Sequence, residues 1–170
     1  MSVLPLSKSA LKRILIVDDI EENRDLLDRA LRNSGYETVT ASSGRDALSI
    51  VSTMVPDLVL LDWMMPQLSG LDTLRAIREL YPRSVLPVIM CTAVGEEMSV
   101  VAAIAAGAND YITKPISIPI LRARMAALFD QMAVISALDA RKSAAELRLL
   151  ERIRSMLGSA GDGKSADGRP

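Results

Sequence analysis

The 170-residue sequence contains no histidine, one cysteine and few aromatic residues. The lack of histidine excludes a catalytic histidine, a histidine-ligated metal and a phosphorylated histidine on this chain. The single cysteine, Cys91, excludes an internal disulfide framework and is typical of a reducing compartment, so we expect a cytoplasmic protein. Aromatic residues make up 3% of the chain and hydrophobic residues 49%, which predicts a core of aliphatic side chains.

Membrane, nucleotide and nucleic-acid signatures are also lacking. No apolar run approaches the ~20 residues of a membrane span, and residues 1–12 lack the basic start and long apolar centre of a signal peptide. The glycine-rich phosphate loops GxxxxGK(S/T) and GxGxxG do not occur, so nucleotide binding is not implied. Because the formal net charge is -1, we expect neither nucleic acid nor an acidic membrane as a partner.

The sequence does contain short apolar strands that alternate with amphipathic helices. The expected strands are Arg13–Val17, Tyr36–Thr40, Leu58–Leu61, Leu86–Cys91 and Asp110–Thr113. The expected helices are Asn23–Ser34, a helix from Gly44 that is stopped by Pro56, Gly70–Tyr81, Glu96–Ala106 and a last helix from Ile118. The first of these carries an apolar stripe of Leu26, Leu27, Ala30 and Leu31. This alternation predicts an α/β fold, a doubly wound five-stranded parallel sheet with helices on both faces.

The stretch Asp57–Pro66 (DLVLLDWMMP) organises this pattern. Its four apolar residues run directly into Asp62, which is typical of a strand buried on both faces of a parallel sheet. Asp62 then lies at the carboxyl end of the strand, where open α/β sheets bind ligands, although it could instead simply begin a turn. Other polar residues follow the remaining strands at the same kind of position, namely Asp18, Asp19, Thr92 and Lys114.

These residue types together suit phosphoryl chemistry. Three carboxylates at one edge repel each other unless a cation joins them, and a small oxygen-only set suits Mg²⁺ better than Ca²⁺. Lys114 adds a positive charge and Thr92 a hydroxyl donor, and both can stabilise charge on a phosphoryl group. Asp62, at the end of a rigid strand, is the predicted nucleophile that would form an acyl phosphate.

Four segments of the chain share a known pattern: Ile14–Asp19 (ILIVDD), Asp57–Pro66 with Gly70, Val88–Ala93 (VIMCTA) and Gly107–Pro115 (GANDYITKP). With these segments in this order, residues 13–130 resemble a receiver domain of the two-component response regulators. The resemblance implies a flavodoxin-like strand order of 2-1-3-4-5. It also implies a phosphorylation-dependent signalling switch whose own chemistry is limited to self-phosphorylation and self-dephosphorylation, rather than an enzyme.

The resemblance assigns the acceptor and the metal ligands by position. Asp62 matches the aspartate that accepts a phosphoryl group from a histidine kinase or a histidine phosphotransfer protein. Asp19 and Asp62 would bind Mg²⁺ directly, the backbone carbonyl of Met64 would complete the protein ligands, and Asp18 would act through water.

It also assigns the residues that respond to phosphorylation. Thr92 matches the hydroxyl that follows the phosphoryl group, Lys114 the lysine that pairs with it, and Tyr111 the aromatic that turns inward on activation. The Lys114–Pro115 peptide is implied to be cis. A half-buried aromatic on a strand is an alternative interpretation of Tyr111 that is compatible with this role.

Two positions beside the acceptor are apolar here. Met64 lies two residues after Asp62, and Val94 lies two residues after Thr92. Both flank the path of a water that would attack the acyl phosphate, and neither side chain can orient that water. We therefore expect slow self-dephosphorylation.

A phosphoryl group adds negative charge and three acceptor oxygens, which can shift the face built from the helix 96–106, the fifth strand and the last helix. The helix 96–106 is rich in apolar residues, including Val100, Val101, Ala103 and Ile104. Packing on the sheet accounts for some of these apolar side chains. The apolar side chains that remain outside the core would form a docking patch for a partner or a second copy.

The last helix extends past a minimal receiver, since no helix breaker occurs between Ile118 and Gly158. Its apolar residues keep a spacing of three and four up to Ile135 and continue it imperfectly to Met156. Residues 131–157 therefore predict a coiled coil, parallel or antiparallel, that makes a homodimer, with a frayed or folded-back helix as the alternative. We interpret residues 1–12 as an irregular lead and 158–170 as a flexible tail or linker stub.

Three alternative functions remain open. The chain could be the N-terminal regulatory part of a longer protein whose output domain is missing here. It could be a Mg²⁺-dependent hydrolase of the haloacid-dehalogenase type, but that family would want an aspartate where this chain has Met64. A DNA-binding regulator is disfavoured, because residues after 130 offer one long helix and no concentrated basic stripe.

Overall fold

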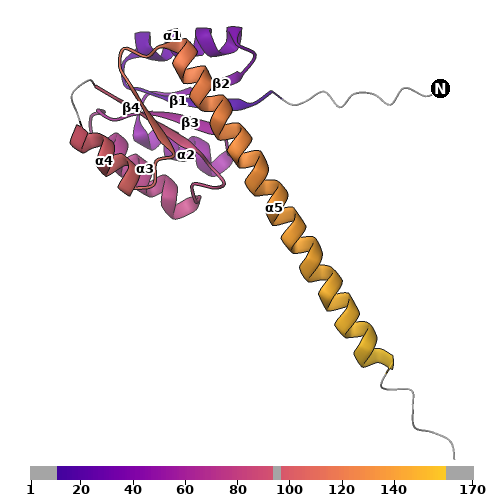
Figure 1. Cartoon of the computed structure of the whole chain (residues 1–170). Helices are drawn as coiled ribbons and strands as arrows, with labels where there is room; N and C mark the ends of the chain where they lie inside the picture. The colour runs from indigo at the N-terminus through magenta and orange to yellow at the C-terminus, as the bar shows by residue number, and fades with distance from the viewer. Residues whose placement is uncertain (1–10, 94–96, 160–170) are drawn as a thin grey trace, which may run out of the picture. The chain divides into compact units, whose positions relative to one another are not determined.

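The computed structural model describes residues 11–93 and 97–159 (Figure 1). Five strands alternate with five helices. In chain order these elements are β1 (Arg13–Val17), α1 (Glu21–Asn33), β2 (Glu37–Ala41), α2 (Gly44–Thr53), β3 (Leu58–Asp62), α3 (Gly70–Leu80), β4 (Val88–Thr92), α4 (Glu97–Ala105), β5 (Asp110–Thr113) and α5 (Ile118–Ser159).

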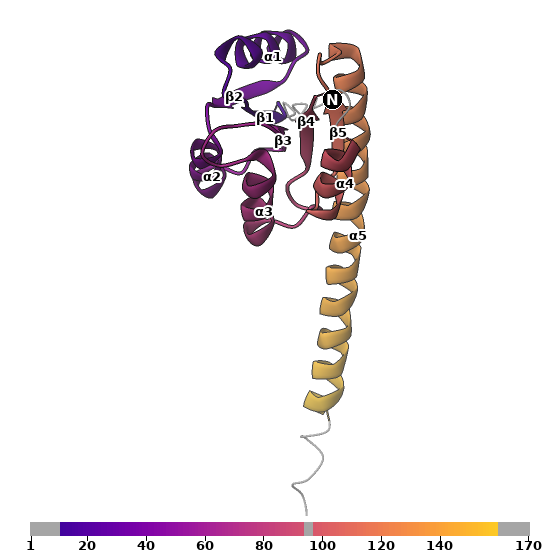
Figure 2. The ribbon, with the colours of Figure 1, turned by 90° about the vertical axis from the view of Figure 1, so that its left-hand side faces the viewer.

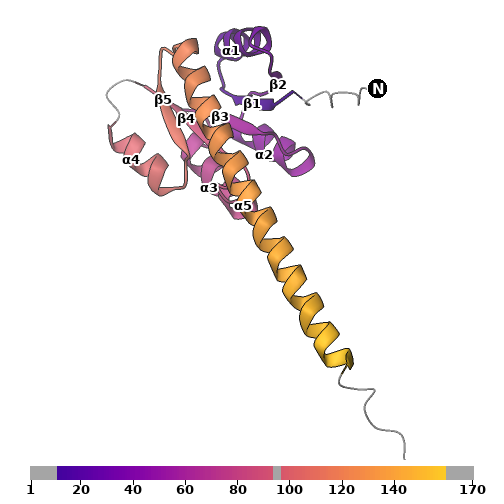
Figure 3. The same ribbon diagram turned by 45° about the vertical axis from the view of Figure 1, so that its right-hand side comes forward.

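The strands form one parallel sheet in the order β2-β1-β3-β4-β5. Two cores fill its two faces. The helices α2, α3 and α4 lie on one side of the sheet, and α1 and the first turns of α5 lie on the other (Figures 2 and 3). One core contains apolar side chains of α2, α3 and α4, and the other contains those of α1 and the first turns of α5. Every residue of β3 and β4 is buried, as expected for central strands covered on both sides. The doubly wound sheet and the order 2-1-3-4-5 predicted from the sequence are confirmed.

Two strands begin later than the sequence suggests. The backbone N–H of Tyr36 donates to the carbonyl of Leu31, so Tyr36 belongs to the turn that closes α1 after Asn33, and β2 begins at Glu37. Pro87 has no N–H and contributes only its carbonyl, to Val59 N, so β4 begins at Val88.

The apolar stripe of α1 is narrower than predicted. Leu27 and Leu31, four residues apart, are buried against the sheet, whereas Leu26 is 62% exposed. A step of one residue turns a helical side chain by about 100°, which moves Leu26 off the buried face. Leu26, which was included in the predicted apolar stripe, therefore lies outside the core.

The helix α5 is continuous over 42 residues, as the lack of a breaker predicted. The described chain divides after Phe129 into two compact units. In the first unit, Leu121, Met125 and Leu128 of α5 are buried in the core. In the second, every side chain from Ser136 to Leu157 is exposed. Among the described helices, none combines the length and apolar character needed to cross a membrane.

Candidate functional site

The strand register brings the predicted site residues to one edge of the sheet. Val17 pairs with Leu61, so Asp18 and Asp62 follow side by side at the carboxyl ends of β1 and β3. Thr92, the last residue of β4, lies one residue beyond Cys91, which pairs with Asp62. These polar side chains converge because parallel strands end at the same edge.

The three aspartates form a compact carboxylate cluster. Asp18, Asp19 and Asp62 each offer one carboxylate oxygen, and these oxygens lie within 4.8 Å of one another. Asp18 and Asp62 are buried, 3% and 5% exposed, whereas Asp19 is exposed. An oxygen-only set with two buried members and one open to solvent fits a hard divalent cation such as Mg²⁺.

Lys114 supplies positive charge to this cluster. Its Nζ lies 2.8 Å from Asp18 Oδ2 and 2.9 Å from Asp62 Oδ1. Its backbone N–H donates to the carbonyl of Thr92 at 2.7 Å, which ties the segment after β5 to the end of β4. The Lys114–Pro115 peptide is cis. The lysine therefore joins residues from the ends of three strands.

Burial and charge act in opposite directions on these groups. Burial raises the pKa of Asp62, and the nearby Asp18 carboxylate adds to the rise, while the Lys114 ammonium and the backbone N–H of Met64 oppose it. For Lys114, burial alone would lower the pKa, but the ion pairs with Asp18 and Asp62 outweigh burial and raise it. Lys114 is thus held charged, and Asp62 is more basic than an ordinary aspartate.

The Thr92 hydroxyl is buried and lacks a hydrogen-bond partner in the described part of the chain. Thr92 is 1% exposed, and its Oγ1 finds no hydrogen-bond partner among residues 11–93 and 97–159. Buried hydroxyls are normally satisfied, because an unmade hydrogen bond costs free energy. A phosphoryl oxygen on Asp62 would offer such an acceptor.

Two residues that the sequence interpretation missed hold Asp18 in place. The Asn23 side-chain amide donates to both Asp18 carboxylate oxygens, at 3.2 and 3.1 Å, and Arg24 donates to the Asp18 carbonyl at 2.7 Å. Both lie in the first turns of α1. An amide side chain at a helix start just after an acidic strand end is the signal that could have indicated Asn23.

Gly70 allows the chain after Asp62 to fold back onto the strand end. Its N–H donates to the Trp63 carbonyl at 3.0 Å. A Cβ at this position would lie 2.0 Å from the Asp62 carbonyl oxygen. Only glycine fits this close approach without moving the backbone of Asp62.

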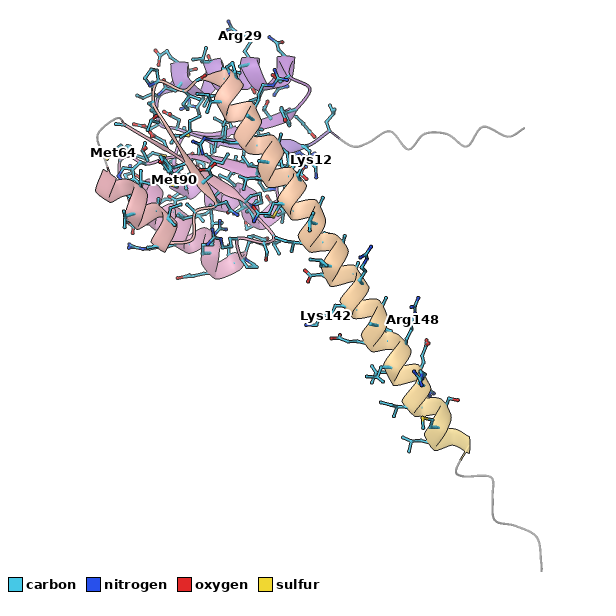
Figure 4. All side chains as sticks on the ribbon, in the orientation of Figure 1. Lys12, Arg29, Met64, Met90, Lys142 and Arg148 are labelled. Atoms are coloured by element: carbon cyan, nitrogen blue, oxygen red, sulfur yellow. The ribbon has the colours of Figure 1, made fainter. Side chains whose placement is uncertain are left out.

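The remaining predicted residues are Met64, Val94 and Tyr111. Met64 is 66% exposed (Figure 4), and Val94 lies outside the described residues. Tyr111 is half-buried and packs on the core below α2, α3 and α4, and the Arg124 guanidinium lies 5.8 Å from its ring centre. Arg124 Nη1 also donates to both carboxylate oxygens of Asp110, at 2.8 and 2.7 Å.

The α4 residues expected to form a docking patch divide between core and surface. Ala103 is buried in the core and Val100 is half-buried. Val101 and Ile104 are 65% and 42% exposed. Among the α4 side chains that the structure describes, Val101 and Ile104 are thus the exposed large apolar ones.

Comparison with known proteins places this geometry in a family. Residues 14–126 match the model of the response regulator receiver domain. The chain is 41% identical over 117 residues to the alkaline phosphatase synthesis transcriptional regulatory protein PhoP of Bacillus subtilis, covering 69% of this chain and 48% of that protein. Over 117 residues it is also 41% identical to the phosphate regulon transcriptional regulatory protein PhoB of Pseudomonas aeruginosa, covering 69% and 51%.

A solved structure shows the same fold. The CheY-like receiver domain protein of Methanospirillum hungatei is 30% identical, with a TM-score of 0.69 over 73% of this chain and 98% of that one. The chain spans about half the length of the curated relatives it matches. On the family match and these likenesses, the chain belongs to the response regulator receiver domain family of two-component signalling.

Proposed function

We propose that this chain is a phosphorylation-dependent switch in which Asp62 accepts a phosphoryl group from a histidine kinase or a histidine phosphotransfer protein. The convergence of Lys114 on Asp62, with an ion pair of 2.9 Å at the end of β3, carries the proposal. The unpartnered Thr92 hydroxyl at the next strand end supports it.

The proposed reaction is a phosphoryl transfer between side chains. A carboxylate oxygen of Asp62 attacks phosphorus, a P–O bond forms, and the P–N bond to the donor imidazole breaks. The imidazole nitrogen keeps the bonding electron pair and takes a proton from solvent. Lys114 then pairs with a phosphoryl oxygen, and Thr92 Oγ1 donates a hydrogen bond to another.

The carboxylate cluster fits Mg²⁺ through its oxygen ligands and its excess of negative charge. Asp19, Asp62 and the backbone carbonyl of Met64 would hold the ion, with Asp18 acting through water. When bound, the ion neutralises negative charge on the phosphoryl oxygens. Asn23 and Arg24 position Asp18 for this arrangement.

The signal would leave through the face of α4, β5 and α5. When Thr92 follows the phosphoryl group, the space it vacates can accept the Tyr111 ring, and the population shifts between two states of this face. The exposed Val101 and Ile104 then offer apolar surface to a partner or a second copy.

We also propose a homodimer, made through residues 131–157 of α5 or through the α4–β5–α5 face. Because the match covers only about half of each relative, and both relatives are named as transcriptional regulatory proteins, this chain would equally serve as the regulatory front end of a longer protein.

Intact mass spectrometry after incubation with acetyl phosphate and Mg²⁺ tests the acceptor. The wild type should gain roughly 80 Da, the mass of one phosphoryl group, and Asp62→Asn should gain nothing. Asp57→Asn is the matched control, since Asp57 pairs with Lys12 before β3 and should leave the gain intact. A wild-type protein that gains no mass with any phosphoryl donor would contradict the proposal. Turnover of small phosphate esters would instead favour the hydrolase alternative.

A further inference from the structure

The part of α5 after Phe129 carries a stripe whose ends are apolar and whose centre is charged; its first two members, Met132 and Ile135, are half-buried and the later ones are exposed. The stripe follows the alternating spacing of four and three residues that marks a coiled-coil seam. Its members are Met132, Ile135, Asp139, Lys142, Glu146, Leu149, Ile153 and Met156. Leu149 and Ile153 are 57% and 44% exposed. Apolar seam positions of this kind are stabilised when a second helix covers them.

The charged centre discriminates between the two directions in which a second copy could lie. In a parallel, in-register pair, each seam residue faces its own copy, so Lys142 would meet Lys142 and Glu146 would meet Glu146. In an antiparallel pair, Lys142 of one copy can face Glu146 of the other. Like charges inside a seam are costly, whereas opposite charges attract.

The residues at the positions flanking the seam do not offset this preference for an antiparallel pair. In many coiled coils, Glu and Lys at the flanking positions set the direction of pairing. Here the flanking positions are mostly small or apolar, namely Ser136, Leu138, Ser143, Ala145, Leu150, Arg152 and Leu157. The central charges of the seam therefore decide the direction.

We propose that residues 131–157 of two copies form an antiparallel helical pair with its two-fold axis at the level of Ala144. This inference rests on the proposed homodimer and adds its direction and register. Lys142 then pairs with Glu146 twice, and Ile135 packs on Ile153 twice. Met132 meets Met156 at each end, and Asp139 faces Leu149 within the seam, a contact that contributes no charge pairing.

A shifted antiparallel register is less suitable. Pairing Asp139 with Lys142 of the second copy would bring Ile153 opposite Leu128. Leu128 is only 7% exposed, because it packs in the core of the first unit. The shifted register would also set Ile135 against Glu146. The register centred on Ala144 pairs Ile135 with Ile153 and Met132 with Met156, and it uses only residues beyond Phe129.

Cysteine cross-linking of the full chain tests the direction. Ile135→Cys and Ile153→Cys are made separately, one with an affinity tag, and oxidised alone and after mixing. Positions 135 and 153 are about 27 Å apart along one helix, so only one direction brings the two thiols together. We expect a covalent dimer in the mixture and none from either variant alone. The native Cys91 is buried, so the wild type should not cross-link, and Ala137→Cys on the outer side of the helix is the matched control.

Charge reversal provides an independent readout by sedimentation equilibrium. Lys142→Glu (Figure 4 labels Lys142) should weaken the dimer about tenfold or more, since Glu would then face Glu146 twice. Adding Glu146→Lys to the same chain should return the dissociation constant to within about threefold of wild type. Arg141→Glu makes the same change in net charge off the seam and should have little effect. In a parallel pair, Lys142→Glu would replace one like-charge contact by another and leave the affinity unchanged.

Each other outcome overturns the inference in a distinct way. Self-cross-linking of Ile135→Cys alone would show a parallel pair. A dimer that cross-links in no combination would refute the register. A wild type that stays monomeric would remove the dimer altogether, while the phosphoryl adduct on Asp62, read by mass, would still report separately on the switch.

Discussion

Lys114 Nζ lies 2.9 Å from Asp62 Oδ1 and so links the residue after β5 to the last residue of β3, across the intervening β4. The same ammonium lies 2.8 Å from Asp18 Oδ2. One lysine thus compensates two buried carboxylates that would otherwise repel each other. The stability of the site depends on this residue, which makes it the first target for mutation.

Replacing Lys114 with Met should destabilise the fold by about 1–3 kcal/mol, because Asp18 and Asp62 are left buried without their cation. Urea unfolding at neutral pH without Mg²⁺ measures the change. The control is Lys12→Met, which breaks the exposed pair with Asp57 and should cost no more than about 1 kcal/mol. Equal losses in both variants would contradict the role of Lys114.

The stability difference between the wild type and Asp62→Asn should depend on pH. The folded chain binds the Asp62 proton more tightly than the unfolded chain, because burial raises its pKa above the ordinary 3.8. The contribution of Asp62 to stability is therefore complete below pH 3.8 and is lost as the pH rises through the raised pKa. In metal-free buffer, Asp62→Asn should gain stability relative to the wild type from pH 3 toward pH 7.

Denaturant titrations at several pH values give this difference directly. Adding Mg²⁺ at pH 7 should stabilise the wild type more than Asp62→Asn, since a ligand of the folded state stabilises it by mass action. A difference that shrinks as the pH rises would mean that Asp62 is not the buried, more basic carboxyl described above.

Gly70→Ala should destabilise the protein by about 1–3 kcal/mol, because the added methyl group overlaps the Asp62 carbonyl and forces backbone movement. The same movement displaces the acceptor, so phosphorylation by acetyl phosphate should slow. Glu79→Ala, at an exposed position of the same helix, should change stability by less than about 0.5 kcal/mol. A Gly70→Ala protein with the stability of the wild type would show that the strand end relaxes freely.

Met64→Asn should shorten the lifetime of the phosphorylated protein by several-fold, up to about tenfold, because an amide beside Asp62 can orient the attacking water and a thioether cannot. The loss of the phosphoryl adduct over time, followed by intact mass, measures this. Met64→Leu keeps the position apolar and should preserve the lifetime. If Met64→Asn loses its phosphate no faster than the wild type, this side chain does not limit hydrolysis.

Much of the fold was predictable because it depends on local patterns. The continuous apolar run before Asp62 predicted β3 and its burial, and the alternation with helical stripes predicted a parallel sheet. Where local reasoning failed, a neighbour's contact decided the outcome. Leu26 is apolar but turned out of the core, since Leu27 and Leu31 already face the sheet. Asn23 was overlooked, because its partner Asp18 becomes visible only when α1 packs beside the end of β1.

By itself, the amino-acid order determined the alternation of strands and helices, the polar residues near the strand ends, and the family to which the chain belongs. Only the tertiary structure decided how those ends meet: that Lys114 reaches across 96 positions to Asp18, and that the Thr92 hydroxyl is buried with no acceptor in the described chain. The physical reason is that residue type and spacing act over a few neighbours, whereas the distances between charges follow from how the whole sheet packs.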